Sequence, residues 1–366
     1  MKLFVLSFCH PLNYLNCFIS VVNVSKESKS IFYTCSLSCP VSHFFNIFHT
    51  ISSPTSSLFP LLFLFSLQSF LFLRGIELVE DVASLTYTQP SVIQSYIEDP
   101  LCLDGYKFDL RLYVLVTSFR PLEAFIHTEG FARISTDKYS LDPSDLKNPF
   151  IHLTNSSIQK QNNQGPSSDN PSRAEDGTGD FGGSKIALKG SYGLWVRLEK
   201  KGFDTKAVWR NISQLVVKSL VIVDDKINHQ PCSFEVFGFD VLIDSKMRCW
   251  LLEVNSSPSL ARENILDKRV KNVLLKDTIQ LINPAPFDRA AVAKILKRRF
   301  CDFSKNKFSL HKDFELENDL KEILGDYIPR KYGEIPNILG GYERLCPHTA
   351  IYTHILKLKS KIIKSD

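Results

Sequence analysis

The sequence predicts a globular domain that mixes strands and helices, and three stretches carry most of that prediction. Residues 106–118 (YKFDLRLYVLVTS) form a long apolar run, with both faces apolar from Val114 to Val116, which predicts a strand in the interior of a sheet. Residues 209–227 place apolar side chains at helical spacing, which predicts a helix with one buried face. Residues 234–260 contain two apolar runs around a short polar turn, which predicts a two-stranded hairpin.

The remaining predicted elements are shorter. Residues 91–100 predict a strand that ends at Asp99-Pro100, because the residue before proline avoids the helical region. Residues 121–136 predict a hairpin that turns at Glu129-Gly130. Residues 159–184 are rich in Gly, Pro and Ser, and they predict a loop inside the domain. Residues 269–282 predict a further helix.

The overall composition is that of an ordinary folded protein. The chain has 366 residues, with 44 basic and 39 acidic side chains, so its net charge is +5. That charge is too small for a polybasic nucleic-acid binder, and the 44% hydrophobic content excludes a disordered chain. Nine cysteines without a close CxxC pair argue against a disulfide scaffold or a zinc finger and favour reduced thiols.

The composition changes abruptly near residue 73. Residues 1–73 hold twelve of the 27 Phe and a single acidic residue, and they show no sustained strand or helix period. This leader is interpreted as a membrane anchor, a buried hydrophobic arm, or sequence foreign to the natural protein. The predicted organisation is the leader, a main domain over 74–284 and a basic C-terminal extension over 285–366. Within the extension, residues 287–307 predict a basic amphipathic helix.

The predicted strand at 106–118 carries three charges on one face. Side chains alternate in a strand, so Lys107, Asp109 and Arg111 share one face, while Phe108 and Leu110 share the other. Charges on a central strand are costly unless a ligand or an opposite charge meets them. The pattern therefore indicates either a binding site or an exposed polar start of the strand.

The predicted hairpin carries a set of oxygen donors. Glu253 and Asn255 lie two residues apart on one strand, and the hairpin brings Asp240 back beside them. Carboxylate and amide oxygens without sulfur or imidazole suit Mg²⁺, whose shell nucleotide phosphates complete. A third segment, residues 152–157 (HLTNSS), offers short polar side chains that cap a helix or contact a phosphate or ribose.

In this order, the motifs YKFDLRLYVLV, HLTNSSIQK, FEVFGFDVLID and WLLEVNSSPSL resemble the tubulin–tyrosine ligase-like family of ATP-grasp amino-acid ligases. Within that family, the chain looks most similar to the tubulin polyglutamylases. The resemblance covers residues 74–284 and implies an α+β ATP-grasp fold, in which antiparallel sheets with flanking helices grip ATP. Family members also carry an N-terminal subdomain with a phosphate-binding lysine. In this sequence we expect that subdomain to be missing or replaced by the leader. Ser156 stands where the family usually has an aromatic residue.

The resemblance implies a role for each matching residue. Arg111 is the candidate for stabilising the reacting groups, and Arg133 and Lys185 match contacts to the incoming amino acid. The implied Mg²⁺ ligands are Asp240, Glu253 and Asn255. The implied ATP contacts are Arg74, Gly75, Gln94, Ser95, Tyr96, Ile97, Lys107, Phe108, Asp109, Thr154 and Asn155.

The activity implied is the ATP- and Mg²⁺-dependent addition of free L-glutamate to glutamate side chains in the acidic C-terminal tails of tubulin, through an acyl phosphate. Tubulin or microtubules are the expected partner, with no nucleic acid and no membrane, in the cytoplasm and on the cytoskeleton, including the cilium or basal body. Two alternatives stay open. One is an inactive, truncated relative that binds microtubules, and the other is a ligase for glycine or tyrosine.

Overall fold

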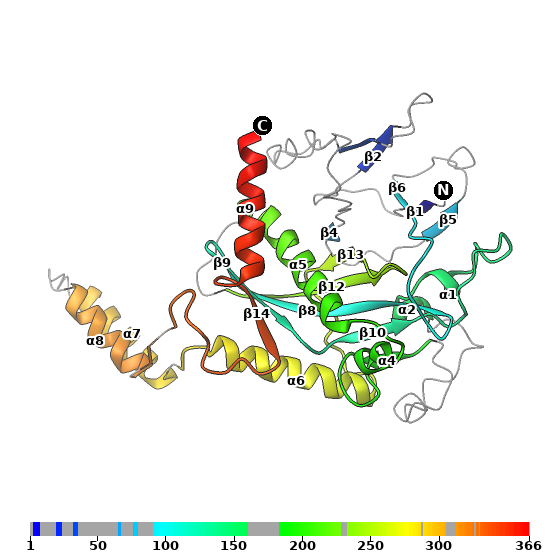
Figure 1. Cartoon of the computed structure of the whole chain (residues 1–366). Coiled ribbons are helices and arrows are strands. Elements are labelled where there is room, and N and C mark those ends of the chain that lie inside the picture. The colour runs from blue at the N-terminus through cyan, green and yellow to red at the C-terminus, as the bar shows by residue number, and fades with distance from the viewer. Residues whose placement is uncertain are drawn as a thin grey trace. The chain divides into compact units, whose positions relative to one another are not determined.

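The computed structural model describes two compact units, Met1–Leu274 with Gly341–Asp366, and Leu275–Gly340 (Figure 1). No element was predicted in residues 1–73, whereas the structure has strands β1 Leu3–Ser7, β2 Ser20–Asn23, β3 Phe32–Cys35 and β4 Phe65–Ser66 there. Strand β1 pairs with β5 Ile76–Val79 and with β6 Ser91–Ser95. Beyond these strands, the described residues are 96–159, 183–227, 233–286, 288–304, 312–325, 327–328 and 330–365.

The largest sheet of the first unit is a mixed sheet centred on one long strand. Strand β8, Tyr106–Phe119, confirms the strand predicted at 106–118, and its residues are buried over most of its length. The sheet runs in the order β11-β10-β8-β12-β13-β4, and every pair in it is antiparallel except β13 with β4. The other members named in this order are β10 Phe131–Ile134, β11 Lys185–Ala187, β12 Glu235–Ile243 and β13 Cys249–Asn255.

The hairpin predicted at 121–136 is wrong, because its two strands do not pair with each other. Strand β9, Leu122–His127, and β10 lie end to end along the same edge of β8, where Ile126 faces Val114 and Phe131 faces Arg111. The chain instead reverses between β8 and β9. Gly130 sits so close to β8 that an added Cβ would lie 2.4 Å from the carbonyl oxygen of Arg111. This glycine therefore permits a close approach of two strands rather than a tight turn.

One face of the sheet is apolar and packs against helices. Phe108, Leu110 and Leu112 share this face with the inward residues of neighbouring strands. They form one buried cluster with α4 Leu194–Lys200 and α5 Thr205–Val223. Helix α5 confirms the helix predicted at 209–227, although it begins earlier, where the Asp204 side chain accepts a hydrogen bond from the backbone of Ala207 at 3.0 Å.

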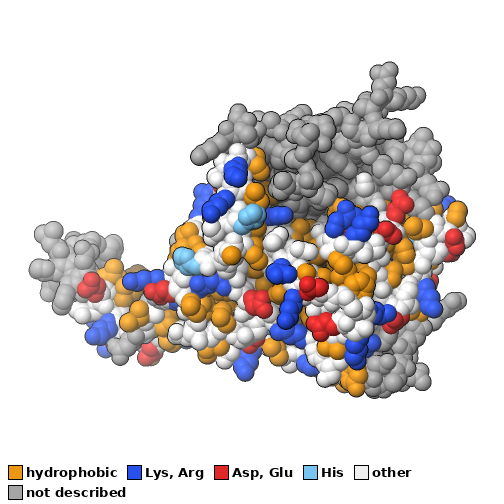
Figure 2. Space-filling view, viewed as in Figure 1, with side chains coloured by type: hydrophobic (Ala, Val, Ile, Leu, Met, Phe, Trp, Pro, Cys, Tyr) orange, Lys and Arg blue, Asp and Glu red, His pale blue; other side chains and the backbone are white. Residues whose placement is uncertain are grey.

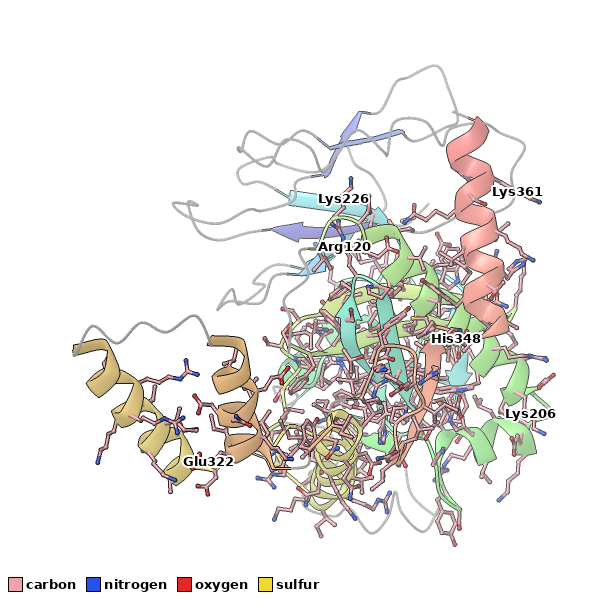
Figure 3. The ribbon with its side chains drawn as sticks, turned by 90° about the vertical axis from the view of Figure 1, so that its left-hand side faces the viewer. Arg120, Lys206, Lys226, Glu322, His348 and Lys361 are labelled. Atoms are coloured by element: carbon pink, nitrogen blue, oxygen red, sulfur yellow. The ribbon has the colours of Figure 1, made fainter. Side chains whose placement is uncertain are left out.

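The C-terminal segment of the chain returns to this unit. Strand β14 Tyr342–Cys346 pairs with β9, and helix α9 Ala350–Ser365 packs beside α5 (Figure 1). Lys359 bonds the carbonyl of Val221 at 2.7 Å and the carboxylate of Asp224 at 2.8 Å. Figure 3 shows Arg120 and Lys226 at the same end of α5, where Arg120 donates to the carbonyl of Asp224 at 3.1 Å. Cations thus satisfy the carbonyls that end this helix.

The second unit includes a helical pair, α7 Arg289–Ser304 and α8 Lys312–Leu324. The helix predicted at 287–307 is confirmed as α7, and the one predicted at 269–282 is confirmed as part of α6 Ile265–Ile282. Arg298 and Arg299 both bond Asp319 of α8, and Lys294 meets Glu322 at 2.8 Å. Acidic side chains of α8 therefore offset much of the basic charge of α7.

The surface charges are scattered, and the described cysteines are not paired. On the face shown in Figure 2, Lys and Arg side chains lie scattered among acidic and apolar ones rather than in one basic stripe. In the part of the chain that the structure describes, Cys102, Cys249 and Cys346 are free thiols. None of the described helices combines the length and apolar character needed to cross a membrane.

Candidate active site

Charged side chains gather on the second face of the sheet, opposite the apolar core. As predicted, Lys107, Asp109 and Arg111 point to one face of β8, and β12 and β10 add Asp240 and Arg133 beside them. Arg111 donates to both carboxylate oxygens of Asp240, from Nε at 2.5 Å and from Nη2 at 3.0 Å. Such two-point contact fixes the orientation of both groups.

Arg133 closes this cluster. Its Nε bonds Asp109 at 2.7 Å, and its Nη2 bonds both Asp109 and Asp240, the latter at 2.8 Å. Burial alone would lower the pKa of Arg133, but Asp109 and Asp240 more than reverse that effect and raise the pKa well above its usual value. Burial alone would raise the pKa of Asp240, yet Arg133 and Arg111 hold it far below its ordinary range. Asp240 and the guanidinium groups of Arg111 and Arg133 are therefore charged at neutral pH.

The three proposed metal ligands lie side by side on the hairpin of β12 and β13. Asp240 faces Glu253 across the two strands, and the amide of Asn255 donates to Glu253 at 3.1 Å. Burial is the main cause that raises the pKa of Glu253 to about 7, and the negative charge of Asp240 is the second. Two carboxylates and an amide oxygen fit a hard cation such as Mg²⁺. No group of three His, Cys, Asp or Glu residues that could hold a metal occurs among the described residues, so the third protein oxygen would be that of Asn255.

The residues proposed to contact ATP surround Lys107. This lysine is buried, and its ammonium donates to the carbonyl of His152 at 2.6 Å and to the hydroxyl of Tyr96 at 3.3 Å. Burial lowers the pKa of Lys107 to about 8. Tyr96 also contacts His152 at 3.0 Å, so the residue that follows β6 and the last residue of α1 Pro149–His152 meet at this lysine.

The other proposed ATP contacts do not all lie on the face of the sheet that carries Lys107. Gln94 and Ser95 end β6, and Ile97 follows two residues later. Thr154 is buried, and the carbonyl of Asn155 accepts from the backbone N–H groups of the last two residues of α2 Ser156–Gln159. Phe108 lies in the apolar core on the opposite face of the sheet from Lys107. Arg74 and Gly75 lie outside the described residues, and all of these ligand roles stay predictions.

Gly238 is a site residue that the sequence reasoning missed. It lies in β12 opposite Tyr113, and an added Cβ would stand 2.9 Å from Cβ of Pro258 and 3.3 Å from Cδ of Arg111. The missing side chain leaves room for Arg111 to lie across β12 and reach Asp240. A glycine inside a strand often marks such a close approach, which is the signal that could have found it.

Substituting Gly238 should therefore disturb the site. We expect Gly238→Ala to lower the free energy of unfolding by about 1–3 kcal/mol, because the new methyl group forces Pro258 or Arg111 to move. Urea unfolding of the two proteins measures this difference. An unchanged or higher stability would contradict the crowding, because alanine in an open strand position is normally the more favourable residue.

Comparison with known proteins shows the family of the chain. The model of the tubulin-tyrosine ligase family matches residues 73–292. The chain is 37% identical to tubulin polyglutamylase TTLL6 of Mus musculus, over 62% of this chain and 27% of that protein. It is 34% identical to tubulin polyglutamylase ttll6 of Danio rerio, over 75% of this chain and 35% of the relative.

A third relative shows a similar overlap. Tubulin polyglutamylase TTLL7 of Homo sapiens is 33% identical, over 69% of this chain and 27% of the relative. The alignments thus span between a quarter and about a third of the length of these proteins. The family match covers more than half of this chain and includes every charged residue of the cluster described above. The chain belongs to the tubulin-tyrosine ligase family.

Proposed function

We propose that this protein is an ATP-dependent ligase that joins free L-glutamate to glutamate side chains in the C-terminal tails of tubulin. The observation that carries the proposal is the buried cluster of Arg111, Arg133, Asp109 and Asp240 beside Glu253. Relatives named tubulin polyglutamylases support tubulin as the partner. The proposed place of action is the cytoplasm and cytoskeleton, including the cilium or basal body.

The reaction must first make a carboxylate reactive. ATP would transfer its γ-phosphoryl group to the acceptor carboxylate, and the α-amine of free glutamate would then attack the acyl phosphate and release phosphate. Arg111 lies at the edge of the buried cluster, with its side chain 16% exposed, so it is the guanidinium best placed to meet the developing negative charge. The two hydrogen bonds to Asp240 hold the Arg111 guanidinium in position.

The same face offers a place for the nucleotide and its metal. Asp240, Glu253 and Asn255 would hold Mg²⁺, which neutralises phosphate charge when it is bound. Lys107, held between Tyr96 and the carbonyl of His152, would contribute a cation toward the nucleotide. The fixed positions of these groups in the sheet mean that little reorganisation is needed during the reaction.

Mass spectrometry tests this proposal directly. The protein is incubated with tubulin, Mg²⁺, ATP and one of glutamate, glycine or tyrosine, and the tubulin tails are then weighed. We expect additions in steps of one glutamate residue that require ATP. Additions of glycine or tyrosine without glutamate would overturn the specificity but leave the ligase class standing. Microtubule binding without any addition would favour the inactive relative.

A further inference from the structure

A chain of hydrogen bonds between side chains ends on Lys107. The imidazole of His152 stands between two oxygens, with Nδ1 3.0 Å from the hydroxyl of Tyr96 and Nε2 3.2 Å from the carbonyl of Asp145. The Tyr96 oxygen in turn accepts from the Lys107 ammonium at 3.3 Å. The side chains of His152, Tyr96 and Lys107 belong to buried residues. The imidazole is therefore linked to the lysine through a single hydroxyl group.

The direction of these hydrogen bonds follows from their two ends. A carbonyl oxygen only accepts, so Nε2 of His152 carries a proton and donates it to Asp145. Two lone pairs facing each other at 3.0 Å would repel, so a proton also lies between Nδ1 and the Tyr96 oxygen. If an imidazolium supplied it, two buried cations would share one hydroxyl oxygen, which is costly. The Tyr96 hydroxyl therefore donates to a neutral imidazole, and its oxygen lone pairs face Lys107.

The titration behaviour of Tyr96 and Lys107 agrees with this direction. Burial is the main cause that raises the pKa of Tyr96 well above its ordinary value, so the hydroxyl keeps its proton. Burial lowers the pKa of Lys107 to about 8, and the negative charge of Asp109 offsets part of that effect. Acceptors near the ammonium therefore decide whether this lysine is charged near neutral pH. His152 contributes to two of them, directly through its carbonyl at 2.6 Å and indirectly through Tyr96.

We propose that His152 is a positioning residue for Lys107: its imidazole takes the hydroxyl proton of Tyr96, so that the Tyr96 oxygen holds the lysine ammonium in place for the phosphate groups of a nucleotide. The nucleotide in this inference rests on the proposed function. Without the acceptor nitrogen, the Tyr96 proton is able to turn toward the ammonium, which disfavours the charged form of the lysine.

Other ionisable groups surround these hydrogen bonds, and substitutions at His152 leave all of them in place. Tyr139 is the competing neighbour, because its hydroxyl hydrogen-bonds Tyr96 and also donates to the carbonyl of Glu98 at 2.7 Å. Burial is the main cause that raises the pKa of Cys102 to about 11 and that of Tyr139 to about 12, so neither titrates near pH 8. The remaining groups are the carboxylates of Asp109, Glu98 and Asp99.

Nucleotide binding over a range of pH tests this role. A non-hydrolysable ATP analogue is titrated with Mg²⁺ in a calorimeter, and the affinity of the unaltered protein should fall as the pH rises through about 8, where Lys107 loses its proton. His152→Phe keeps a flat ring without an acceptor nitrogen, and it should move the midpoint of this fall about one pH unit lower. His152→Asn should restore the midpoint, because its Oδ1 replaces Nδ1 as the acceptor.

Two tyrosine variants identify the acceptor. Tyr96→Phe removes the hydroxyl itself and should shift the midpoint as His152→Phe does. Tyr139→Phe is the matched control, since it removes the neighbouring hydroxyl and should leave the midpoint unchanged. A shift in Tyr139→Phe but not in His152→Phe would make Tyr139 the acceptor and overturn the inference. Equal midpoints in all the proteins, or a His152→Asn protein that behaves like His152→Phe, would overturn it as well.

A second measurement needs no nucleotide and separates this inference from the proposed function. The pKa of Lys107 is about 8 in the folded protein and about 10.5 in an unfolded chain, so the unfolded state binds more protons between these values. Its contribution to stability against urea should therefore rise with pH in this window, and the rise should begin about one pH unit lower in His152→Phe than in His152→Asn.

If the rise in stability shifts in this way but the protein neither binds the analogue nor adds glutamate to tubulin, the link from His152 to Lys107 stands and the proposed function fails. If the protein adds glutamate and neither pH midpoint differs among the variants, the proposed function stands and the inference fails.

Discussion

Asp240→Asn is expected to lower the free energy of unfolding by about 3–5 kcal/mol, because it removes the charge that two buried guanidinium groups share. Arg111 and Arg133 would keep their charges, since a guanidinium does not lose its proton in this pH range. Among the described residues, Asp109 would then be the one carboxylate left that bonds Arg133. The Asp240→Asn protein should also lose ligase activity.

Urea unfolding at pH 7 measures this loss, with Asp104→Asn as the control. Asp104 also pairs with a lysine, Lys201 at 2.8 Å, but both side chains are more than 40% exposed. An exposed pair contributes only about 0–1 kcal/mol, so the control should unfold almost as the unaltered protein does. Similar losses in both variants would mean that the buried cluster does not contribute more to stability than a surface ion pair.

The sequence was sufficient to predict the parts of the site that follow from strand alternation. Lys107, Asp109 and Arg111 share a face because they lie two residues apart, and the hairpin pairs Asp240 with Glu253 because their turn is short. Each of these inferences needs only one strand or one local connection.

The contacts of Arg133 needed information that the sequence does not contain. They depend on the register of β10 against β8 and on the position of β12 at the other edge of β8. The hairpin predicted at 121–136 failed for the same reason, because an apolar run does not reveal which neighbour its strand pairs with. Likewise, nothing in the spacing of α7 and α8 shows that Asp319 bonds both Arg298 and Arg299.

Glu253→Gln is expected to remove a pH dependence from stability. The pKa of Glu253 is about 7 in the folded protein and about 4.5 in an unfolded chain. The folded state therefore binds more protons between these values, so the unaltered protein should lose up to about 3 kcal/mol of stability as the pH rises from 4.5 to 7. The amide cannot ionise, so the variant should lack this contribution and be at least as stable at pH 7.

The same substitution is expected to reduce ligase activity at least about 100-fold, because an amide gives the proposed Mg²⁺ site less negative charge at the point where phosphate charge must be offset. Stability and activity would then move in opposite directions in one variant, which simple unfolding cannot produce. Glutamate incorporation into tubulin at saturating ATP, followed over a range of Mg²⁺ concentrations, measures the activity. Full activity in a folded Glu253→Gln protein would remove Glu253 from the metal site and leave its raised pKa as a consequence of burial beside Asp240 alone.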